Sequence, residues 1–82
     1  MYSVEFSKRA EEQFSKFPKE LQSRIVDVLE RIKIRPHHFV KRKSGTPYFI
    51  MRVGKHRIIL DIQNSKLIIY VIEIGIRGNV YK

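Results

Sequence analysis

The sequence predicts an α+β domain in which two helices pack on one face of an antiparallel sheet. Three apolar runs stand in the last third of the chain, at residues 48–53, 57–62 and 67–74. They are rich in Ile, Val, Tyr and Phe, which favour a pleated, half-buried surface. Two apolar stripes with helical spacing precede them, one on each side of Pro18. A short alternating run at residues 2–6 adds an N-terminal strand.

Length and composition narrow the class of protein. The 82 residues are expected to form a single domain, residues 1–82, and a hydrophobic content of 43% fits a compact chain. The absence of cysteine excludes a disulfide or thiolate–metal framework and allows a cytoplasmic protein, which is the location that we expect. No apolar stretch approaches the roughly 18 residues that would span a membrane, so no membrane partner is expected.

The net charge of +9 is unevenly distributed along the chain. Residues 1–32 hold six basic and six acidic side chains, whereas residues 33–82 hold eleven basic side chains and two acidic ones, Asp61 and Glu73. The whole excess therefore lies in the second part of the chain. Such asymmetry points to a polyanionic partner such as nucleic acid, an anionic membrane surface or an acidic protein; a solvated basic surface is the simpler alternative.

The first helix is predicted to follow the N-terminal strand directly. Ser7 is a good N-cap because its hydroxyl oxygen can accept from the first free amides of a helix. The apolar stripe of this helix consists of Ala10, Phe14 and Phe17. Pro18 ends the helix and can start the next one, because a proline at the first helical position loses no hydrogen bond.

The second helix carries a longer apolar stripe and should end before Pro36. Its stripe consists of Leu21, Ile25, Val28, Leu29 and Ile32. Two helices joined by so short a link form an antiparallel hairpin. Both stripes need an apolar surface to cover, and the sheet supplies it.

Residues 35–47 are expected to form a loop. It contains three adjacent cations, Lys41, Arg42 and Lys43. They could contact phosphate or simply be solvated, and the sequence leaves both open. His37 and His38 are not expected to bind a metal ion, because neighbouring side chains on a loop diverge and no nearby Cys, Asp or Glu completes a ligand shell. No metal site is predicted.

The three later strands should be joined by turns at Gly54-Lys55 and at residues 63–66, giving a meander. Side chains alternate between the two faces of a strand. The simplest assembly turns one set toward the helices, namely Ile58, Leu60, Ile62, Ile72 and Ile74. The opposite face then gathers Arg52, Arg57 and Arg77. Arginines on a sheet face are desolvated at a cost unless an anion meets them, although a lattice of ion pairs with Asp61 and Glu73 is an alternative.

Three phrases of the sequence resemble the RelE/ParE toxin superfamily, most closely its small archaeal and bacterial RelE toxins. They are the Val4-Glu5-Phe6-Ser7 stretch that opens a helix, the phrase MRVGKHRII at residues 51–59, and the ending IGIRGNVYK at residues 74–82. The resemblance covers essentially the whole chain, in the order strand, helix, helix and three strands.

The resemblance implies a toxin of a type II toxin–antitoxin system that inhibits translation. Its activity would be an endoribonuclease reaction, or mRNA interferase activity, which cleaves mRNA in the ribosomal 30S decoding site. The reaction would proceed without metal or other cofactor, by attack of a ribose 2′-hydroxyl on the adjacent phosphate. The implied catalytic residues are Arg57, Arg77 and Tyr81. The resemblance also implies that Arg52 binds RNA and phosphate. The basic residues expected to join it are Lys41, Arg42, Lys43, Lys55 and Lys82.

The resemblance also implies an acidic RelB-like antitoxin, with a toxin–antitoxin heterotetramer among the expected assemblies. The chain departs from the family pattern at Ile50, His56, Ile76 and Gly78. Ile50 occupies a second basic position, and His56 stands where an aromatic residue is usual. These departures bear on the acid and base of the reaction more than on the family.

The chemistry of RNA cleavage fits part of this residue set. The reaction needs a group that takes the 2′ proton, cations that stabilise the pentavalent phosphate, and a donor for the leaving oxygen. Paired arginines suit the second task because each planar fork can meet two phosphate oxygens. Tyr81 would need neighbouring cations to titrate, and parity places His56 opposite Arg57, which favours a packed histidine. A ParE-like toxin that inhibits a topoisomerase and a non-catalytic nucleic-acid-binding module remain alternatives.

Overall fold

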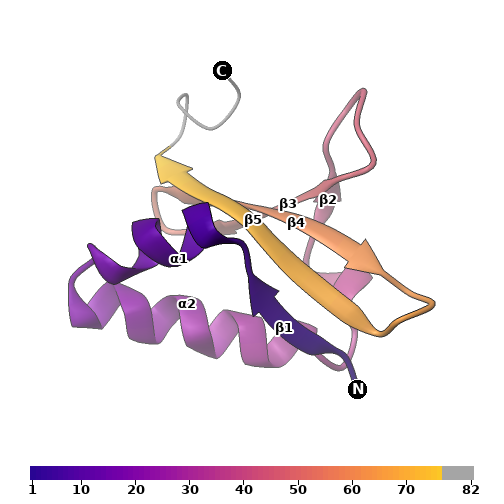
Figure 1. Cartoon of the computed structure of the whole chain (residues 1–82), viewed down its shortest axis with the longest axis horizontal. Helices are drawn as coiled ribbons and strands as arrows, with labels where there is room; N and C mark the ends of the chain where they lie inside the picture. Colours follow the sequence, from indigo (N-terminus) through magenta and orange to yellow (C-terminus); the bar gives the residue numbers. More distant parts are fainter. Residues whose placement is uncertain (77–82) are drawn as a thin grey trace.

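A computed structural model describes residues 1–76 and confirms the α+β fold, with two helices against a five-stranded sheet (Figure 1). The elements follow one another as β1 (Ser3–Phe6), α1 (Lys8–Ser15), α2 (Lys19–Ile32), a single 3-10 turn η1 (Pro36–His38), β2 (Lys41–Arg42), β3 (Phe49–Val53), β4 (His56–Gln63) and β5 (Ile68–Ile76). The predicted N-terminal strand, helix pair and three-stranded meander are all present. Neither helix within residues 1–76 is long and apolar enough to cross a membrane.

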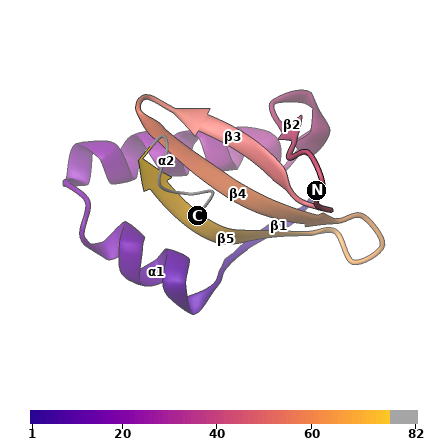
Figure 2. The same ribbon diagram turned by 90° about the horizontal axis from the view of Figure 1, so that it is seen from above.

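The sheet has the order β1-β5-β4-β3-β2. The β2–β3, β3–β4 and β4–β5 pairs are antiparallel, whereas β1 runs parallel to β5 with Ser3 opposite Ile68. The first strand of the chain therefore lies beside the last described one, and the helix pair connects it to the far side of the sheet. In Figure 2 the strands lie in front of α2, so that view faces the sheet surface that the described helices leave open.

The expectation of a plain loop at residues 35–47 was wrong in part. Pro36, which is buried, opens the 3-10 turn, and Lys41 and Arg42 form a short edge strand opposite Ile50 and Phe49 of β3. Two paired residues are too few to show any alternation in the sequence, so the tertiary pairing with β3 decides their conformation.

The helix boundaries agree in part with the predicted caps and breakers. The hydroxyl oxygen of Ser7 accepts from the amide of Ala10 at 3.0 Å, which confirms the N-cap. The first helix ends at Ser15, so Phe17 lies in the link and still packs against the core. Pro18 is the N-cap of α2 rather than its first helical residue.

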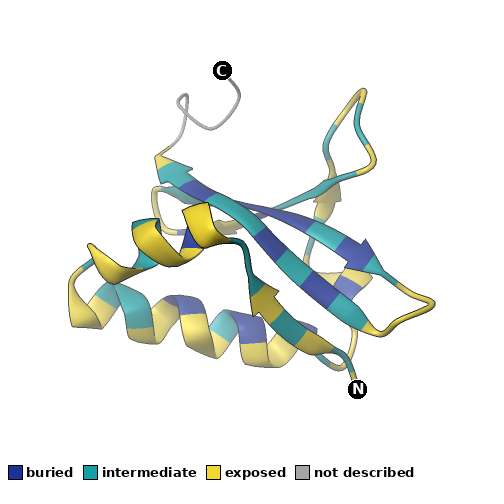
Figure 3. Cartoon of the chain, viewed as in Figure 1, coloured by how far each residue is buried: buried dark blue, intermediate teal, exposed yellow. Residues whose placement is uncertain are grey.

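The core lies between the helix stripes and one face of the sheet (Figure 3). The helices contribute Ala10, Ile25, Leu29 and Ile32, all buried. The sheet contributes Met51, Val53, Ile58, Leu60, Ile62, Ile69, Val71 and Ile74. The predicted inward set is thus confirmed for Ile58, Leu60, Ile62 and Ile74.

The prediction that Ile72 faces the helices was wrong, because β5 contains a register shift. Leu60 pairs with Val71 whereas Ile59 pairs with Glu73, which leaves Ile72 as an extra residue between two regular pairs. Such a bulge reverses the alternation along the strand. Val71 therefore enters the core on one side of the bulge and Ile74 on the other, and Ile72 is only half-buried.

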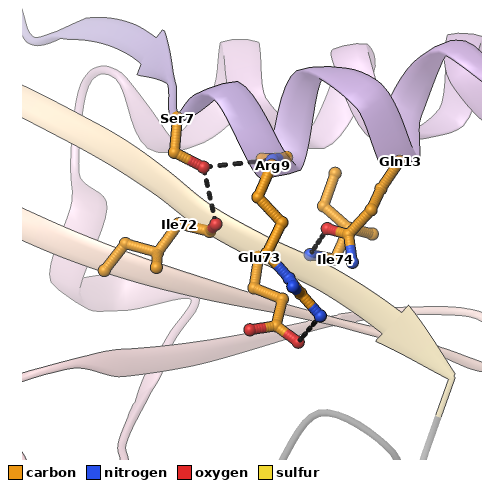
Figure 4. A network of polar contacts seen from close by, with 7 residues as sticks. Ser7, Arg9, Gln13, Ile72, Glu73 and Ile74 are labelled. Carbon is orange, nitrogen blue, oxygen red and sulfur yellow. Dashed lines mark hydrogen bonds and ion pairs between the residues drawn. The ribbon is translucent and has the colours of Figure 1, made fainter.

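The first helix covers the edge of β5 beyond the end of β1. The Ser7 hydroxyl donates to the Ile72 carbonyl at 2.7 Å, and the Gln13 side-chain oxygen accepts from the Ile74 amide at 2.8 Å (Figure 4). These side chains satisfy backbone groups that β1 no longer reaches. The helix thereby protects an otherwise open sheet edge and fixes the bulge.

Candidate functional site

The sheet surface opposite the core, here called the open face, carries two arginines directly across from each other. Arg52 of β3 pairs with Arg57 of β4, next to the turn at Gly54. Met51 and Ile58, the neighbours of these arginines along the strands, are buried in the core, which fixes both arginines on the open face. Like charges opposite each other destabilise a sheet, so this arrangement suits a site that receives an anion.

Two hollows lie on either side of the Arg52–Arg57 pair, and the two arginines line both of them. The first hollow, of about 310 Å³, is completed by Gly54, Lys55, His56 and Ile76. The second hollow, of about 360 Å³, is completed by Phe39, Lys41, Arg42 and Ile50. An anion held by the pair would therefore have space for an attached group on each side.

The structure brings several predicted phosphate-binding cations to these hollows. Lys55 lines the first hollow, and Lys41 and Arg42 line the second. The Arg42 guanidinium also lies over the Phe49 ring, with its central carbon 5.8 Å from the ring centroid. Lys43 does not line either hollow; its amide donates to the Tyr48 carbonyl at 2.9 Å and so holds the hairpin that carries its neighbours.

The two carboxylates of the basic part of the chain, Asp61 and Glu73, each contact a neighbouring side chain. Glu73 forms an ion pair with Arg9 of α1 at 3.5 Å (Figure 4). Asp61 accepts a hydrogen bond from the Gln63 side chain at 3.1 Å. Helix α1, which protects the edge of β5, thus also supplies the ion-pair partner of Glu73.

His56 packs on the helix side of the sheet, as parity predicts. Its ring meets Phe17 edge to face, with 5.0 Å between ring centroids. The residue also borders the first hollow. A histidine held against an aromatic ring has an evident packing role, and its register position puts it on the opposite side from Arg57.

Tyr70 lies on the open face at the β1 side, opposite Asp61. The carboxylate of Glu5, its partner on β1, raises the pKa of the Tyr70 phenol above the ordinary value of 10.0. The negative charge of Glu5 is the larger cause, and the hydrogen bond to the same carboxylate adds to it. This phenol therefore keeps its proton at neutral pH.

The remaining predicted site residues, Arg77, Tyr81 and Lys82, lie outside the described residues, as does Gly78. The convergence of Arg77 and Tyr81 with Arg57 stays a prediction.

Within residues 1–76 no group of three or more His, Cys, Asp or Glu side chains could hold a metal ion. The two loop histidines have separate neighbours: His37 lies 3.1 Å from the Asn64 side-chain oxygen, and His38 packs edge to face on Phe39.

Phe39 was missed by sequence reasoning, and so was the role of Ile50 as part of a hollow. Phe39 is 49% exposed and is not among the residues that pack against the core. The available signal was an aromatic side chain just before the run of loop cations. Its meaning depends on the β2–β3 pairing, which brings it beside the arginines of the open face.

The fold is that of RelE/ParE-type toxin domains, and comparison with known proteins agrees. Residues 4–81 match the family described as the ParE toxin of the type II toxin–antitoxin system parDE. The chain belongs to this family and is a type II toxin of the RelE/ParE superfamily. No curated protein sequence matches the chain.

Solved structures with the same fold come from bacteria and archaea. The toxin of the intact Escherichia coli RelBE toxin–antitoxin complex superposes with a TM-score of 0.84 at 17% identity, covering 96% of this chain and 100% of that one. The toxin of the RelE–RelB complex from Pyrococcus horikoshii OT3 superposes with a TM-score of 0.83 at 21% identity, covering 95% of this chain and 97% of that one. The matching chain of the RelBE2 complex from Mycobacterium tuberculosis superposes with a TM-score of 0.81 at 20% identity, covering 93% of this chain and 98% of that one. At these identities the similarity establishes the fold.

Proposed function

We propose that this toxin is a ribosome-dependent endoribonuclease that cleaves mRNA in the 30S decoding site and so inhibits translation. The observation that carries the proposal is the cross-strand Arg52–Arg57 pair, which lies on the open face between two hollows. A phosphodiester is an anion joined to a nucleoside on each side, and this arrangement offers a place for all three parts. The superposition on RelE toxins supports the same conclusion.

In this mechanism the 2′-oxygen of a ribose loses its proton to a general base and attacks the adjacent phosphorus. The bond from phosphorus to the 5′-oxygen of the next nucleotide breaks, and this oxygen takes up a proton and leaves, so the products are a 2′,3′-cyclic phosphate and a 5′-hydroxyl. Arg57, which is half-buried on the central strand β4, stabilises the negative charge that develops on the pentavalent phosphate. Arg52 is exposed and positions the same phosphate from the neighbouring strand. A guanidinium is a poor base, so another group takes the 2′ proton.

The resemblance to RelE toxins implies two further residues at the end of the chain. Arg77 joins Arg57 on the phosphate, and Tyr81 stacks on the nucleotide or transfers a proton. The Tyr81→Phe variant separates the two roles, because a stacking ring survives the loss of the hydroxyl and a proton donor does not. The reaction needs no metal ion, so EDTA should leave the rate unchanged once ribosome integrity is controlled.

The decisive test is single-turnover cleavage of mRNA on a programmed ribosome, with ribosome affinity measured in parallel. Arg57→Ala should lower the cleavage rate about 10²–10³-fold, much more than it weakens binding, because the arginine acts chiefly on the transition state. Arg57→Lys should recover only part of the rate, since lysine restores the charge without the planar fork. Arg35→Ala removes an exposed arginine that lines neither hollow and is the matched control.

A second candidate function is inhibition of a topoisomerase, because the matching family is named for ParE toxins. Such a toxin would bind its target protein and would not need the Arg57, Arg77 and Tyr81 set. A DNA supercoiling assay with purified topoisomerase tests this directly. Inhibition of supercoiling without cleavage of mRNA by the parent would favour this candidate, and the absence of both activities would favour a plain nucleic-acid-binding module.

We further propose an acidic antitoxin as the partner of this chain. The structural relatives named above were solved as toxin–antitoxin complexes, and a net charge of +9 calls for an anionic counterpart. The antitoxin would wrap the basic surface with helix or strand segments, and a heterotetramer of two toxins and two antitoxins is one assembly that we propose. Both proteins would act in the cytoplasm, where ribosomes are found.

A further inference from the structure

The second hollow differs from the first in having an aromatic wall. Phe39 stands at its border with 49% of its surface exposed, and Ile50 contributes an apolar patch from β3. Four cations surround these two side chains: Lys41, Arg42, Arg52 and Arg57. The volume of about 360 Å³ is at the lower end of the range for small-molecule sites.

An exposed phenylalanine ringed by cations suits one class of ligand in particular. A nucleotide combines a flat base, which stacks on aromatic rings, with a phosphate that binds arginine and lysine. Stacking on an aromatic ring tolerates any base, because every base presents a π-face. An acidic peptide would satisfy the cations but would not need a flat, exposed ring between them.

A structural role does not account for the position of Phe39. The next residue, Val40, is half-buried and packs against the core, whereas Phe39 is exposed. The Phe39 ring contacts His38 edge to face at 5.0 Å, and His38 is itself exposed. The ring is therefore held at the surface, with much of it open to the hollow.

We propose that the second hollow binds the nucleobase next to the phosphate held by Arg52 and Arg57, with Phe39 as its stacking residue. The identity of the ligand as mRNA rests on the proposed function above. The two arginines line both hollows, so a phosphate between them leaves one neighbouring nucleoside on the Phe39 side and the other on the His56 side. Truncation of Phe39 would therefore weaken the binding of the nucleoside on the Phe39 side and leave the binding of the other one unchanged.

The test is a thermodynamic cycle between Phe39 and single bases of the message. Ribosomes are programmed with mRNA whose decoding-site codon is 2′-deoxy, so that it lacks the attacking hydroxyl and cannot be cleaved. A second set of messages carries one abasic position at a time through the same codon. Toxin affinity is measured for the parent, Phe39→Ala, Phe39→Leu and Phe39→Tyr, and for Ile34→Ala, which truncates a 66% exposed side chain that lines neither hollow.

Phe39→Ala should weaken binding to the intact message about 5- to 150-fold, the range expected for one stacked base. The effect should vanish when one particular codon position is abasic, and only that one, because the stacking partner is then already missing. Phe39→Tyr should bind like the parent, whereas Phe39→Leu should resemble Phe39→Ala because it keeps the apolar volume without the ring. Ile34→Ala should bind like the parent.

The proposal is overturned if Phe39→Ala binds the intact message as tightly as the parent, or if its loss is the same on every abasic message. It is also overturned if leucine restores affinity as well as tyrosine. Absence of any binding to programmed ribosomes by the parent counts against it in the same way. If the parent binds with the predicted dependence on Phe39 but fails to cleave an ordinary ribose message, the stacking site stands and the cleavage mechanism falls.

Discussion

The Ser7 side chain holds three parts of the fold together with one hydroxyl group. Its oxygen accepts from the amide of Ala10 at 3.0 Å and so caps α1. The same hydroxyl donates to the carbonyl of Ile72 at 2.7 Å, at the bulge of β5 (Figure 4). Replacing Ser7 with alanine removes both contacts without adding volume, and it leaves a part-buried carbonyl without this donor.

The expected loss of stability is the sum of the two contacts. Loss of a serine N-cap typically lowers the free energy of unfolding by about 1 kcal/mol. Loss of an ordinary internal hydrogen bond lowers it by about 0.5–1.5 kcal/mol. Together these give about 1.5–2.5 kcal/mol for Ser7→Ala. In a domain of this size that loss corresponds to a fall in Tm of about 6–20 °C.

Urea denaturation followed by circular dichroism measures the loss, and two variants separate its causes. Ser7→Asp keeps a good cap but places a carboxylate against the Ile72 carbonyl, so it should still lose at least about 0.5–1.5 kcal/mol. Ser15→Ala, the matched control, removes an exposed hydroxyl that donates to the Glu12 carbonyl and should change stability by less than about 0.5 kcal/mol. A loss below about 0.5 kcal/mol for Ser7→Ala would refute the assigned coupling between helix cap and bulge.

Three other predictions test the core, the open face and the partner. Leu29→Ala should lower the free energy of unfolding by about 2–5 kcal/mol in urea denaturation, whereas truncation of the exposed Val26 should have little effect; equal losses would mean that the stripe does not face a core. Glu5→Gln should lower the pKa of Tyr70 toward 10.0 in an ultraviolet titration with Tyr70→Phe as reference, and an unchanged titration would contradict the assigned cause. Because the folded pKa is the higher one, the stabilisation from this pair is complete below the ordinary value and is lost as pH rises through the raised value. The association rate with the acidic antitoxin should fall as salt is added, and a rate indifferent to ionic strength would contradict the electrostatic reasoning.

The helices and the main strands were predictable because each extends over enough residues to show its period. The stripe of α2 repeats over three turns, and its buried members Ile25, Leu29 and Ile32 are those that the spacing selects. The N-cap at Ser7 was predictable because capping is local chemistry. Alternation likewise placed Arg52 and Arg57 on one face, since the turn at Gly54 joins their strands without a register shift.

The unpredicted features arise from contacts between segments far apart in the chain. The bulge at Ile72 inserts one residue where β5 meets β4, and a period-2 pattern contains no sign of it. The short strand β2 exists only because β3 pairs with it. Phe39 becomes part of a site for the same reason, because this pairing carries the preceding loop to the arginines. These features depend on which distant segments lie close together in the fold, whereas the predicted ones depend on residue types that are near each other in the sequence.

One face of the sheet packs on the core and the other carries the basic residues, which explains how so small a domain can hold a basic site. The core cluster formed by the helices and the sheet lies on the helix side, so the stability of the fold does not depend on attractive contacts between Arg52 and Arg57. Like charges facing each other across a strand pair typically cost about 0.2–1 kcal/mol, which is small beside the loss expected for one core side chain such as Leu29. The core can therefore tolerate the repulsion in the absence of ligand. In the proposed function a bound phosphate would contact both guanidiniums, and two cations side by side favour an anion over a neutral ligand.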